Sequence, residues 1–373
     1  MKKTLRPQTI SGTVRDLRLF HPSIFVDNEK KRRSGHVGHG LAAFGPGKII
    51  DFYPNYAYDR CEGHSAFGWM EYRISTNGGK SFGRAKKLPY SFETMLQGVH
   101  TISVEKAVSP REDVIVAICL VNSQYEPICC EPWDNPTVIR SEDGGKTWSE
   151  PIQLSPYRGR VYDAIYHEGS IYAFEFCHDG STTFLGHRPE HLYRLFKSDD
   201  EGKSFYEVSV IPFPDTKDRA YGALAISPEN KLIAYAYNFA NETHMDCAIS
   251  DDMGKTWEWV GTSYVAKKIR NPQIGLLDGQ YILHGRSGGW EDADFVLYTS
   301  ADGIHWDEGT VLVEKKTACF YSNNVTVRDE TGKERMLVQY SENIFENLKP
   351  TDKGWRSQVN VMHFWLESAD ECK

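Results

Sequence analysis

Apolar residues along this chain gather in short runs with partial alternation, and polar turns separate the runs. Two runs, KIIDFYPN at residues 48–55 and DVIVAICLV at 113–121, are rich in β-branched and aromatic residues, which is typical of strands. Similar runs follow at residues 169–176, 231–238, 279–286 and 335–342. A turn-like stretch precedes each run, so we predict six strands that each follow a tight turn.

A second series of strand-like segments lies just upstream of these turns. Its members occupy residues 37–44, 100–107, 160–166, 220–227, 271–277 and 321–327. One order of elements therefore recurs six times: an inner strand, a tight turn, a second strand, a longer loop and a third strand. Strands of this kind indicate an all-β protein.

A short pattern follows the third strand in five of these units. SEDGGKTW at 141–148 is a clear copy, and the copies begin at residues 75, 141, 198, 250 and 300. Asp or Asn at the third position bonds to nearby backbone N–H groups, and Gly at the fifth takes a positive φ. Trp or Phe at the last position packs between sheets. We call these segments the repeat turns and expect each to join a third strand to a fourth.

The spacing of the repeat turns predicts the architecture. They lie about 50 to 66 residues apart, which suits a propeller blade of four antiparallel strands. We therefore predict one domain over residues 1–373, a six-bladed β-propeller of four-stranded antiparallel blades. RSQVNVMHFWLES at 356–368 is the last third strand. The N-terminal stretch near QTISGTVRDL, residues 8–17, is expected to supply the missing outer strand and close the ring.

The composition and net charge limit the classes of molecule that the protein is expected to bind. The chain has 40% hydrophobic and 25% charged residues and a net charge of -8, which disfavours nucleic acid and anionic membrane as partners. No apolar run is long enough to span a bilayer, and none follows Met1, so a cytoplasmic location is expected. The eight cysteines are scattered without a Cys-x-x-Cys motif and are expected to be reduced. We expect no cofactor and no metal; the oligomeric state is left open.

The repeat turns also carry a resemblance to a known family. The pattern Ser-x-Asp-x-Gly-x-(Ser/Thr)-(Trp/Phe) resembles the Asp box, or BNR repeat, of the sialidase superfamily. The resemblance extends from about residue 20 to 365. It implies a six-bladed propeller with a glycan site at the central axis, although fold by itself does not decide function.

Strand direction predicts which face holds such a site. Because strands alternate in direction, the repeat turns and the first-to-second turns share one face. The opposite face holds the starts of inner strands and the ends of second strands. Arginines recur at this level, and a group of guanidinium groups suits a carboxylate ligand. These arginines are Arg160, Arg219, Arg270 and Arg286. The alternative is that each pairs with an acid such as Asp163 or Glu342.

Other polar side chains are predicted at the same level. The expected sugar-binding residues are Tyr162, Asp163, Tyr221, Asn271, Gln273 and His100. His36 and His39 suggest a metal site, but a spacing of three residues in a strand places the two side chains on opposite faces. His39 is instead expected to reach the axis as an acid/base or as a partner of a sugar hydroxyl.

The resemblance extends to part of the chemistry. FYSNNVTV, followed by RMLVQYSE, resembles the sialidase segment that carries the nucleophilic tyrosine, which implies this role for Tyr321. A neutral phenol avoids like-charge repulsion with the carboxylate of sialic acid, and tyrosine nucleophiles are known in glycosidases. NPQIGLLDGQYILHGR resembles a second family segment and implies that Arg286 is one of three family arginines.

Three departures from the family pattern accompany this match. The glutamate that activates the tyrosine falls on or near Asn271, and His21 in FHPSIF stands where the first-blade arginine is expected. The remaining family arginine has no evident counterpart in 290–320. The loop of the acid/base aspartate is NYAYDRCEGHS, in which Asp59 and Glu62 are the candidates.

Three functions follow as hypotheses. The first is a sialidase-like exo-glycosidase that hydrolyses a terminal acidic sugar, with Tyr321 as nucleophile, Asp59 or Glu62 as acid/base, and Arg270 and Arg286 as carboxylate clamp. The second is a propeller polysaccharide lyase that cleaves a uronate-containing glycan by β-elimination. Its base would come from the set His39, His100, Tyr162 and Tyr221. The third is a non-catalytic glycan-binding propeller, whose binding would be indifferent to Tyr321→Phe.

Overall fold

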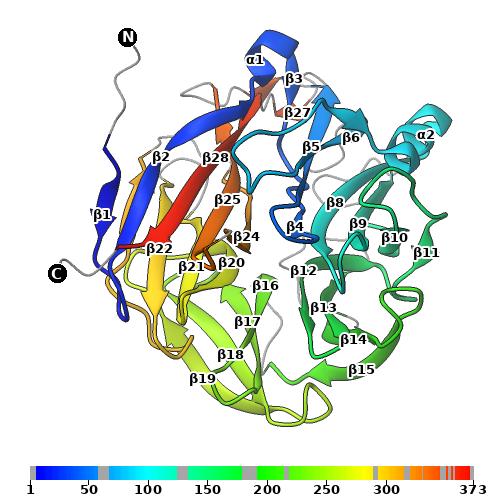
Figure 1. Cartoon of the computed structure of the whole chain (residues 1–373). Helices are drawn as coiled ribbons and strands as arrows, with labels where there is room; N and C mark the ends of the chain where they lie inside the picture. Colours follow the sequence, from blue (N-terminus) through cyan, green and yellow to red (C-terminus); the bar gives the residue numbers. More distant parts are fainter. Residues whose placement is uncertain are drawn as a thin grey trace.

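The structure is a computed structural model in which most of the chain is described. The described residues are 6–57, 67–123, 133–178, 191–213, 218–288, 293–314, 320–329, 331–344 and 358–369, with the backbone of β26 (Pro350–Thr351) and β27 (Gly354–Trp355). In this part of the chain, six antiparallel sheets stand in a ring around a central axis (Figure 1). The predicted six-bladed β-propeller is confirmed.

Four blades have the predicted four strands, ordered outward from the axis. The second blade contains β8 (His100–Val108), β9 (Ile115–Ser123), β10 (Thr137–Ser141) and β11 (Ile152–Gln153). The third contains β12 (Gly159–His167), β13 (Ser170–Cys177), β14 (Tyr193–Ser198) and β15 (Tyr206–Ile211). The fourth contains β16 (Arg219–Ile226), β17 (Leu232–Asn238), β18 (His244–Ser250) and β19 (Glu258–Tyr264). The fifth contains β20 (Arg270–Leu277), β21 (Gln280–Arg286), β22 (Phe295–Ser300) and β23 (Thr310–Val313).

The sixth blade closes the ring with the N-terminal part of the chain. Its strands run β24 (Ser322–Arg328), β25 (Glu334–Asn343), β28 (Val359–Ser368), β2 (Leu17–Val26) and β1 (Gln8–Ile10). Closure by an N-terminal strand is confirmed, but the strand that pairs with β28 begins where the predicted segment ends. Leu17 and Leu19 of β2 are buried against the blade, whereas β1 is an additional edge strand.

The first blade departs most from the predicted pattern. Its inner position is shared by β3 (Arg33–Ser34) and β4 (Leu41–Ala43), which both pair with β5 (Ile49–Ala57). β6 (Gly68–Ser75) and β7 (Lys86–Lys87) complete the sheet. The predicted inner strand over 37–44 is therefore wrong for its first half, because residues 35–40 leave the ladder.

Helices were not expected from the sequence pattern. α1 (Asn28–Lys31) follows β2, and α2 (Pro89–Gln97) packs its buried Ser91 and Met95 between the first and second blades. Proline at the first turn and a left-handed Gly98 after the last explain where α2 begins and ends. Neither helix, nor any other described segment in helical form, has the length and apolar character needed to cross a membrane.

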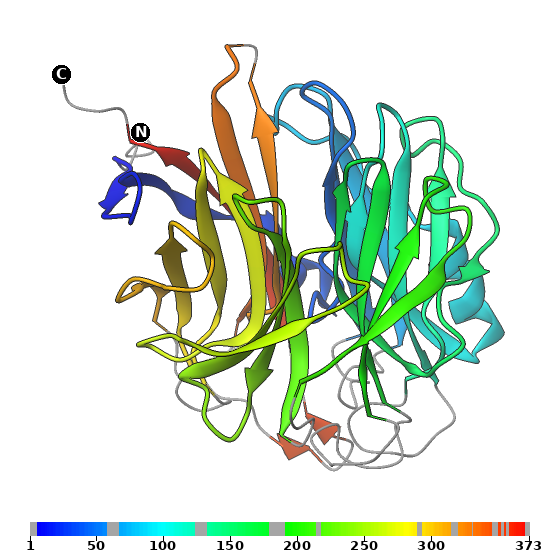
Figure 2. The ribbon, with the colours of Figure 1, turned by 90° about the horizontal axis from the view of Figure 1, so that it is seen from below.

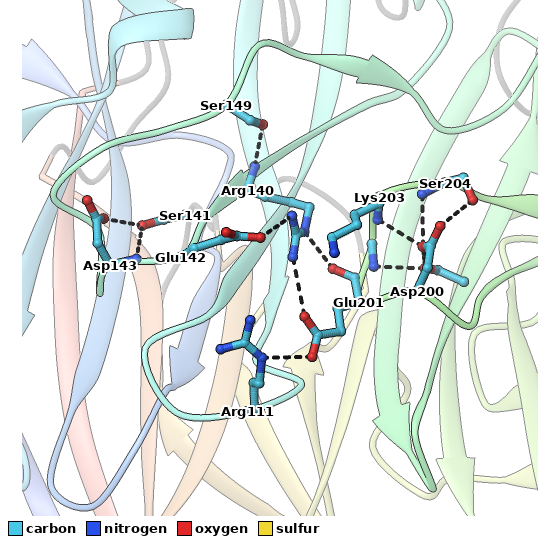
Figure 3. Close-up of polar contacts among 12 residues, drawn as sticks. Arg111, Arg140, Ser141, Glu142, Asp143, Ser149, Asp200, Glu201, Lys203 and Ser204 are labelled. Carbon is cyan, nitrogen blue, oxygen red and sulfur yellow. Dashed lines mark hydrogen bonds and ion pairs between the residues drawn. The ribbon is translucent and has the colours of Figure 1, made fainter.

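The repeat turns form the predicted hydrogen bonds (Figure 3). The hydroxyl of Ser141 donates to Asp143 at 2.8 Å and accepts from the Gly145 N–H at 2.8 Å. The carboxylate of Asp143 also accepts from the N–H and hydroxyl of Thr147, at 2.9 and 2.6 Å. Trp148 packs edge-on against Tyr72 of the preceding blade, so the turn also joins two blades.

The repeat turn of the third blade contacts the second blade. Arg140 donates to the backbone carbonyl of Glu201 at 2.6 Å, and Arg111 donates to the Glu201 carboxylate at 2.8 Å (Figure 3). Gly202 has a φ of 79°, and a Cβ there would lie 2.7 Å from Val116 in the second blade. Glycine is therefore required both by the turn and by the close approach of two blades.

The two faces of the ring are assigned by register. Gly144 donates to the backbone carbonyl of Asp113, so a repeat turn lies beside a first-to-second turn. At the other end of the sheets, Arg270 pairs with Arg286 and Arg219 pairs with Asn238. Figure 2 shows the blades from the side, with the hairpin of β24 and β25 projecting at one face. The starts of inner strands and the ends of second strands therefore share one face, as predicted.

Candidate active site

Four inner strands are irregular near the axis. Their ladders shift between Val104 and Lys106, Val161 and Asp163, Arg219 and Gly222, and Arg270 and Gln273. A β-bulge breaks strict alternation and redirects neighbouring side chains, and bulges are common beside active sites. In β8 the result is that Glu105 and Lys106, which are adjacent in sequence, are both buried.

A buried ion pair surrounded by tyrosines lies at the axis. Arg160 is fully buried and donates from Nε and Nη2 to Glu105 Oε2, at 2.9 and 2.6 Å. Its guanidinium carbon lies 4.6 Å from the ring centre of Tyr221, 5.0 Å from that of Tyr162 and 5.6 Å from that of Tyr321. The structure thus brings together four predicted site residues and adds Glu105, which the sequence pattern did not single out.

A second buried cation ties the centre of the ring together. Lys106 Nζ donates to Gln273 at 2.9 Å and to Asn323 at 2.8 Å, and it forms an ion pair with Asp163 at 2.8 Å. The Asp163 carboxylate also accepts from the Leu224 N–H at 2.8 Å. Asp163, predicted to bind sugar, is therefore engaged in bonds between blades, and Gln273 shares the same network.

One axial pocket unites several of these groups. It is lined by Gly38, His39, Glu105, Tyr162, Gln273, Tyr321 and Ser322. Its water-accessible volume is about 10 Å³, which is about the space for one water molecule. The pocket admits a single small group, such as a hydroxyl, and a whole sugar ring needs more room.

The two histidines of GHVGHG both lie near this pocket. Residues 35–40 are not in a strand, so the expectation of opposite strand faces does not apply. The His36 ring lies edge-on to Tyr321 with centroids 5.2 Å apart, and His39 lines the pocket. Among the described residues, no three His, Cys, Asp or Glu side chains form a metal-binding group.

His39 is neutral and retains an unused acceptor. Its Nδ1 lies 3.0 Å from Gln339 Oε1, and Nε2 has no hydrogen-bond partner among the described residues. Burial lowers the pKa of His39 to about 4, because charging the ring in a buried site is costly. At neutral pH the ring is therefore uncharged and one of its nitrogens carries a lone pair.

The other predicted arginines lie beside acids that we had not named. Arg219 Nε donates to Asp246 at 2.5 Å, and Arg270 Nε lies 3.3 Å from Glu242. Arg286 faces Arg270 across the ladder and is buried. Burial raises the pKa of Glu242, and the nearby Arg270 and Arg286 oppose that rise. Both guanidinium groups thus act on the Glu242 carboxylate at this edge of the fifth blade.

Asn271 has an unusual environment for a polar residue. It is fully buried with a φ of 54°, and neither its side-chain oxygen nor its nitrogen has a hydrogen-bond partner in the described part of the chain. Asparagine tolerates the left-handed region better than most residues. A buried amide without partners is costly, so this position is under functional or structural strain.

Two further predicted residues, His100 and His21, are not among the residues that line the pocket. His100 is partly exposed at the start of β8, with Nε2 3.3 Å from Asp134. His21 is exposed on β2 and bonds to the Arg6 carbonyl at 2.9 Å, so it does not occupy an axial position. Asp59 and Glu62 lie outside the described residues.

Comparisons with known proteins locate the fold. No protein-family model and no curated protein sequence matches the chain. A structure of unknown function from Dyadobacter fermentans is similar with a TM-score of 0.72 at 14% identity, covering 95% of this chain and 99% of that one. The Hadza microbial sialidase Hz136 is similar with a TM-score of 0.64 at 12% identity, covering 92% and 67%.

A third similar structure carries a ligand. Trypanosoma rangeli sialidase in complex with 2,3-difluorosialic acid, described as a covalent intermediate, has a TM-score of 0.59 at 11% identity. The match covers 89% of this chain and 54% of that protein, so the chain spans about half of that sialidase. The protein therefore has the fold of a sialidase-like six-bladed β-propeller.

Proposed function

We propose that the protein is a glycoside hydrolase of the sialidase type that removes a terminal acidic sugar from glycans. The observation that supports this function most is the axial pocket, where Tyr321 and a carboxylate with a free oxygen line the same small space. Glu105 Oε2 binds Arg160, whereas Oε1 has no hydrogen-bond partner among the described residues. A phenol with a nearby base is the arrangement that an activated tyrosine nucleophile requires.

The proposed reaction proceeds in two steps. Tyr321 attacks the anomeric carbon, its phenol proton passes to Glu105 Oε1, and the leaving oxygen receives a proton from a general acid. Asp59 and Glu62 stay the candidates for that acid. Water then hydrolyses the sugar–tyrosine bond, and the tyrosine oxygen regains its proton. Arg160, which lies over the Tyr321 ring, stabilises negative charge on the phenol oxygen.

An acidic sugar fits the charges at the fifth blade. Arg270 and Arg286 are paired across the ladder and both are buried there, and two neighbouring guanidinium groups suit a ligand carboxylate. The likeness to a sialidase that binds difluorosialic acid supports the same class of sugar. Because the pocket holds only one small group, one substituent of the sugar enters it and the ring lies outside.

A product screen tests this function. Sialosides and uronosides are incubated with the protein, and the expected result is a free reducing sugar. Tyr321→Phe should abolish turnover while ligand binding is kept. Tyr235→Phe is the matched control, because this buried phenol bonds to the Gly303 carbonyl, away from the pocket. Unchanged turnover in Tyr321→Phe contradicts the nucleophile role, and binding without turnover of any tested glycan favours a binding propeller.

The state of His39 favours a second candidate, a polysaccharide lyase. In β-elimination a base takes the proton next to the uronate carboxylate, and the leaving oxygen departs with a proton while a C=C bond forms. His39 is neutral with an unused acceptor, whereas burial holds the pKa of Tyr162 well above its usual value. His39 is thus the better base of the two. A product with new ultraviolet absorbance separates elimination from hydrolysis.

A further inference from the structure

Four buried side chains form a hydrogen-bonded chain that ends at the axial pocket. His39 Nδ1 lies 3.0 Å from Gln339 Oε1, and Gln339 Nε2 donates to Asp51 Oδ1. The second oxygen of Asp51 lies 2.7 Å from His363 Nε2. All four residues are buried. They come from the first and sixth blades, the two that ring closure brings together.

The chemistry of the partners fixes the direction of these bonds. Gln339 Nε2 also donates to the backbone carbonyl of Phe52 at 3.3 Å. A carbonyl oxygen accepts hydrogen bonds and never donates them, so the amide nitrogen of Gln339 must face Phe52 and Asp51. The amide oxygen therefore faces His39. An oxygen at this position requires a proton on Nδ1.

It follows that Nε2 of neutral His39 is the unprotonated nitrogen. Nε2 has no hydrogen-bond partner in the described part of the chain, and His39 lines the pocket. Glu105 lines the same pocket and has its own unpartnered acceptor, Oε1. Nε2 is thus a buried acceptor beside a space for one small group, and it requires a donor there, because a buried acceptor without a partner is costly.

We propose that Gln339 and Asp51 are positioning residues that hold His39 as its Nδ1–H tautomer, so that Nε2 accepts a hydrogen bond from a sugar hydroxyl at the axis. The identity of the donor as a sugar hydroxyl rests on the proposed function. The tautomer itself follows from the hydrogen bonds alone. A methyl ether at that hydroxyl leaves Nε2 of His39 unpaired and should bind about 10- to 100-fold more weakly than the parent sugar.

Nuclear magnetic resonance of the full-length protein with ¹⁵N-labelled histidine tests the tautomer without any substrate. His39 is assigned by comparison with His39→Gln. We expect an Nδ1–H ring with a bare Nε2 between pH 6 and 8. The groups that face His39 in this range are Asp51 and His363 behind Gln339, and Glu105, Tyr162 and Tyr321 across the pocket. An Nε2–H ring in the wild type overturns the proposal.

A variant of Gln339 separates positioning from folding. Gln339→Met removes the acceptor at Nδ1 and should give a mixture of tautomers. Gln280→Met is the matched control, because Gln280 is equally buried but bonds to Arg15 away from the pocket. His39 signals that are unchanged in Gln339→Met contradict the positioning role.

Activity gives an independent measurement. With a substrate from the product screen, Gln339→Met should lower kcat/KM about 10-fold or more, and the control Gln280→Met should leave kcat/KM unchanged. An Nδ1–H tautomer in a protein that turns over no glycan contradicts the proposed function and leaves the tautomer assignment standing. An Nε2–H tautomer in a protein that turns over a glycan contradicts the tautomer assignment and leaves the proposed function standing.

Discussion

The repeat turns and the axial pocket differ in how completely their polar groups are bonded. In the repeat turns, Ser141 and Asp143 are saturated by local donors and acceptors, and Ser198 and Asp200 make the same bonds one blade further on. At the axis the bonding of polar groups is less complete. His39, Glu105 and Asn271 there keep polar atoms without partners in the described part of the chain.

This difference indicates that the repeat turns stabilise the fold, whereas the axial residues serve the chemistry of the site. The repeat turn occurs in five blades because each of these blades needs a closed hairpin and a contact with the preceding blade. Residues that occur once serve a single site. Buried polar atoms without partners cost free energy, and natural proteins retain them mainly where function requires it. The contrast predicts large functional effects at the axis and small structural effects at the turns.

The largest effect is expected at the free carboxylate of the pocket. Glu105→Gln removes the proposed proton acceptor of Tyr321, and turnover should fall by about 10²- to 10⁴-fold, the usual contribution of a general base. Steady-state kinetics on a glycan from the product screen measures this. Glu142→Gln, at a repeat turn, is the control and should retain full turnover. Equal turnover in both variants would remove Glu105 from the reaction.

A large loss of stability is expected when the buried ion pair is broken. Arg160→Met leaves Glu105 as an uncompensated buried charge, so the free energy of unfolding should fall by about 3–5 kcal/mol. Urea unfolding of the single and double variants measures it. Arg160→Met combined with Glu105→Gln should recover much of the loss, since no charge is then unpaired. A double variant no more stable than the single one contradicts this explanation.

An intermediate effect is expected from pH. Burial lowers the pKa of His39 to about 4 and that of His284 to about 3. Below the ordinary value of about 6.5, the unfolded chain binds protons that the folded protein does not, so stability falls as pH falls. The loss runs from about pH 6.5 toward 4, at about 1.4 kcal/mol per pH unit for each histidine.

Urea unfolding between pH 7 and 5 measures this slope. His284→Gln should flatten it by the share of one histidine, and His39→Gln should do the same. The two histidines lie near the same pocket: His39 lines it, and His284 bonds to Ser322, which also lines it. A slope that neither substitution changes would show that the two rings do not cause the pH dependence.

The smallest effect is expected at a repeat turn. Asp143→Ala removes the bonds from Thr147 and Ser141 but leaves no buried charge, so the free energy of unfolding should fall by about 1 kcal/mol. Thermal or urea unfolding measures the loss, with Asp251→Ala as a control at an exposed residue of another turn. Turnover should be unchanged. A drop in turnover would mean that the turn acts beyond the hairpin.

The sequence predicts what is local and periodic in this molecule. The bonds of Asp143 and the packing of Trp148 follow from eight consecutive residues, and their spacing defines blades and faces. The two-residue β3 and the departure of residues 35–40 from the ladder escape such patterns, because glycine-rich segments carry no strand periodicity. α2 escapes them because it occurs in one connection only.

The site is harder to predict because it depends on bulges and ring closure. Glu105 stands beside Lys106 in a buried strand, and two adjacent charges there are the signal that points to a bulge. Asp51 and Gln339 meet only because the first and sixth blades are neighbours. The sequence pattern placed Tyr321 and Arg160 at the starts of inner strands, and the two lie near each other at the axis, whereas the pattern did not indicate Glu105 as the acid partner of Arg160.

The pairing of β2 with β28 also sets an order for biosynthesis. Residues 17–26 leave the ribosome well before residues 359–368, yet the two segments lie side by side in one sheet. The outer edge of the sixth blade therefore cannot be covered until translation has passed residue 368. Until then the growing chain presents unpaired strand edges, which are prone to aggregate, and such long-range pairing folds slowly. A nascent chain of this protein is thus a natural client for chaperones.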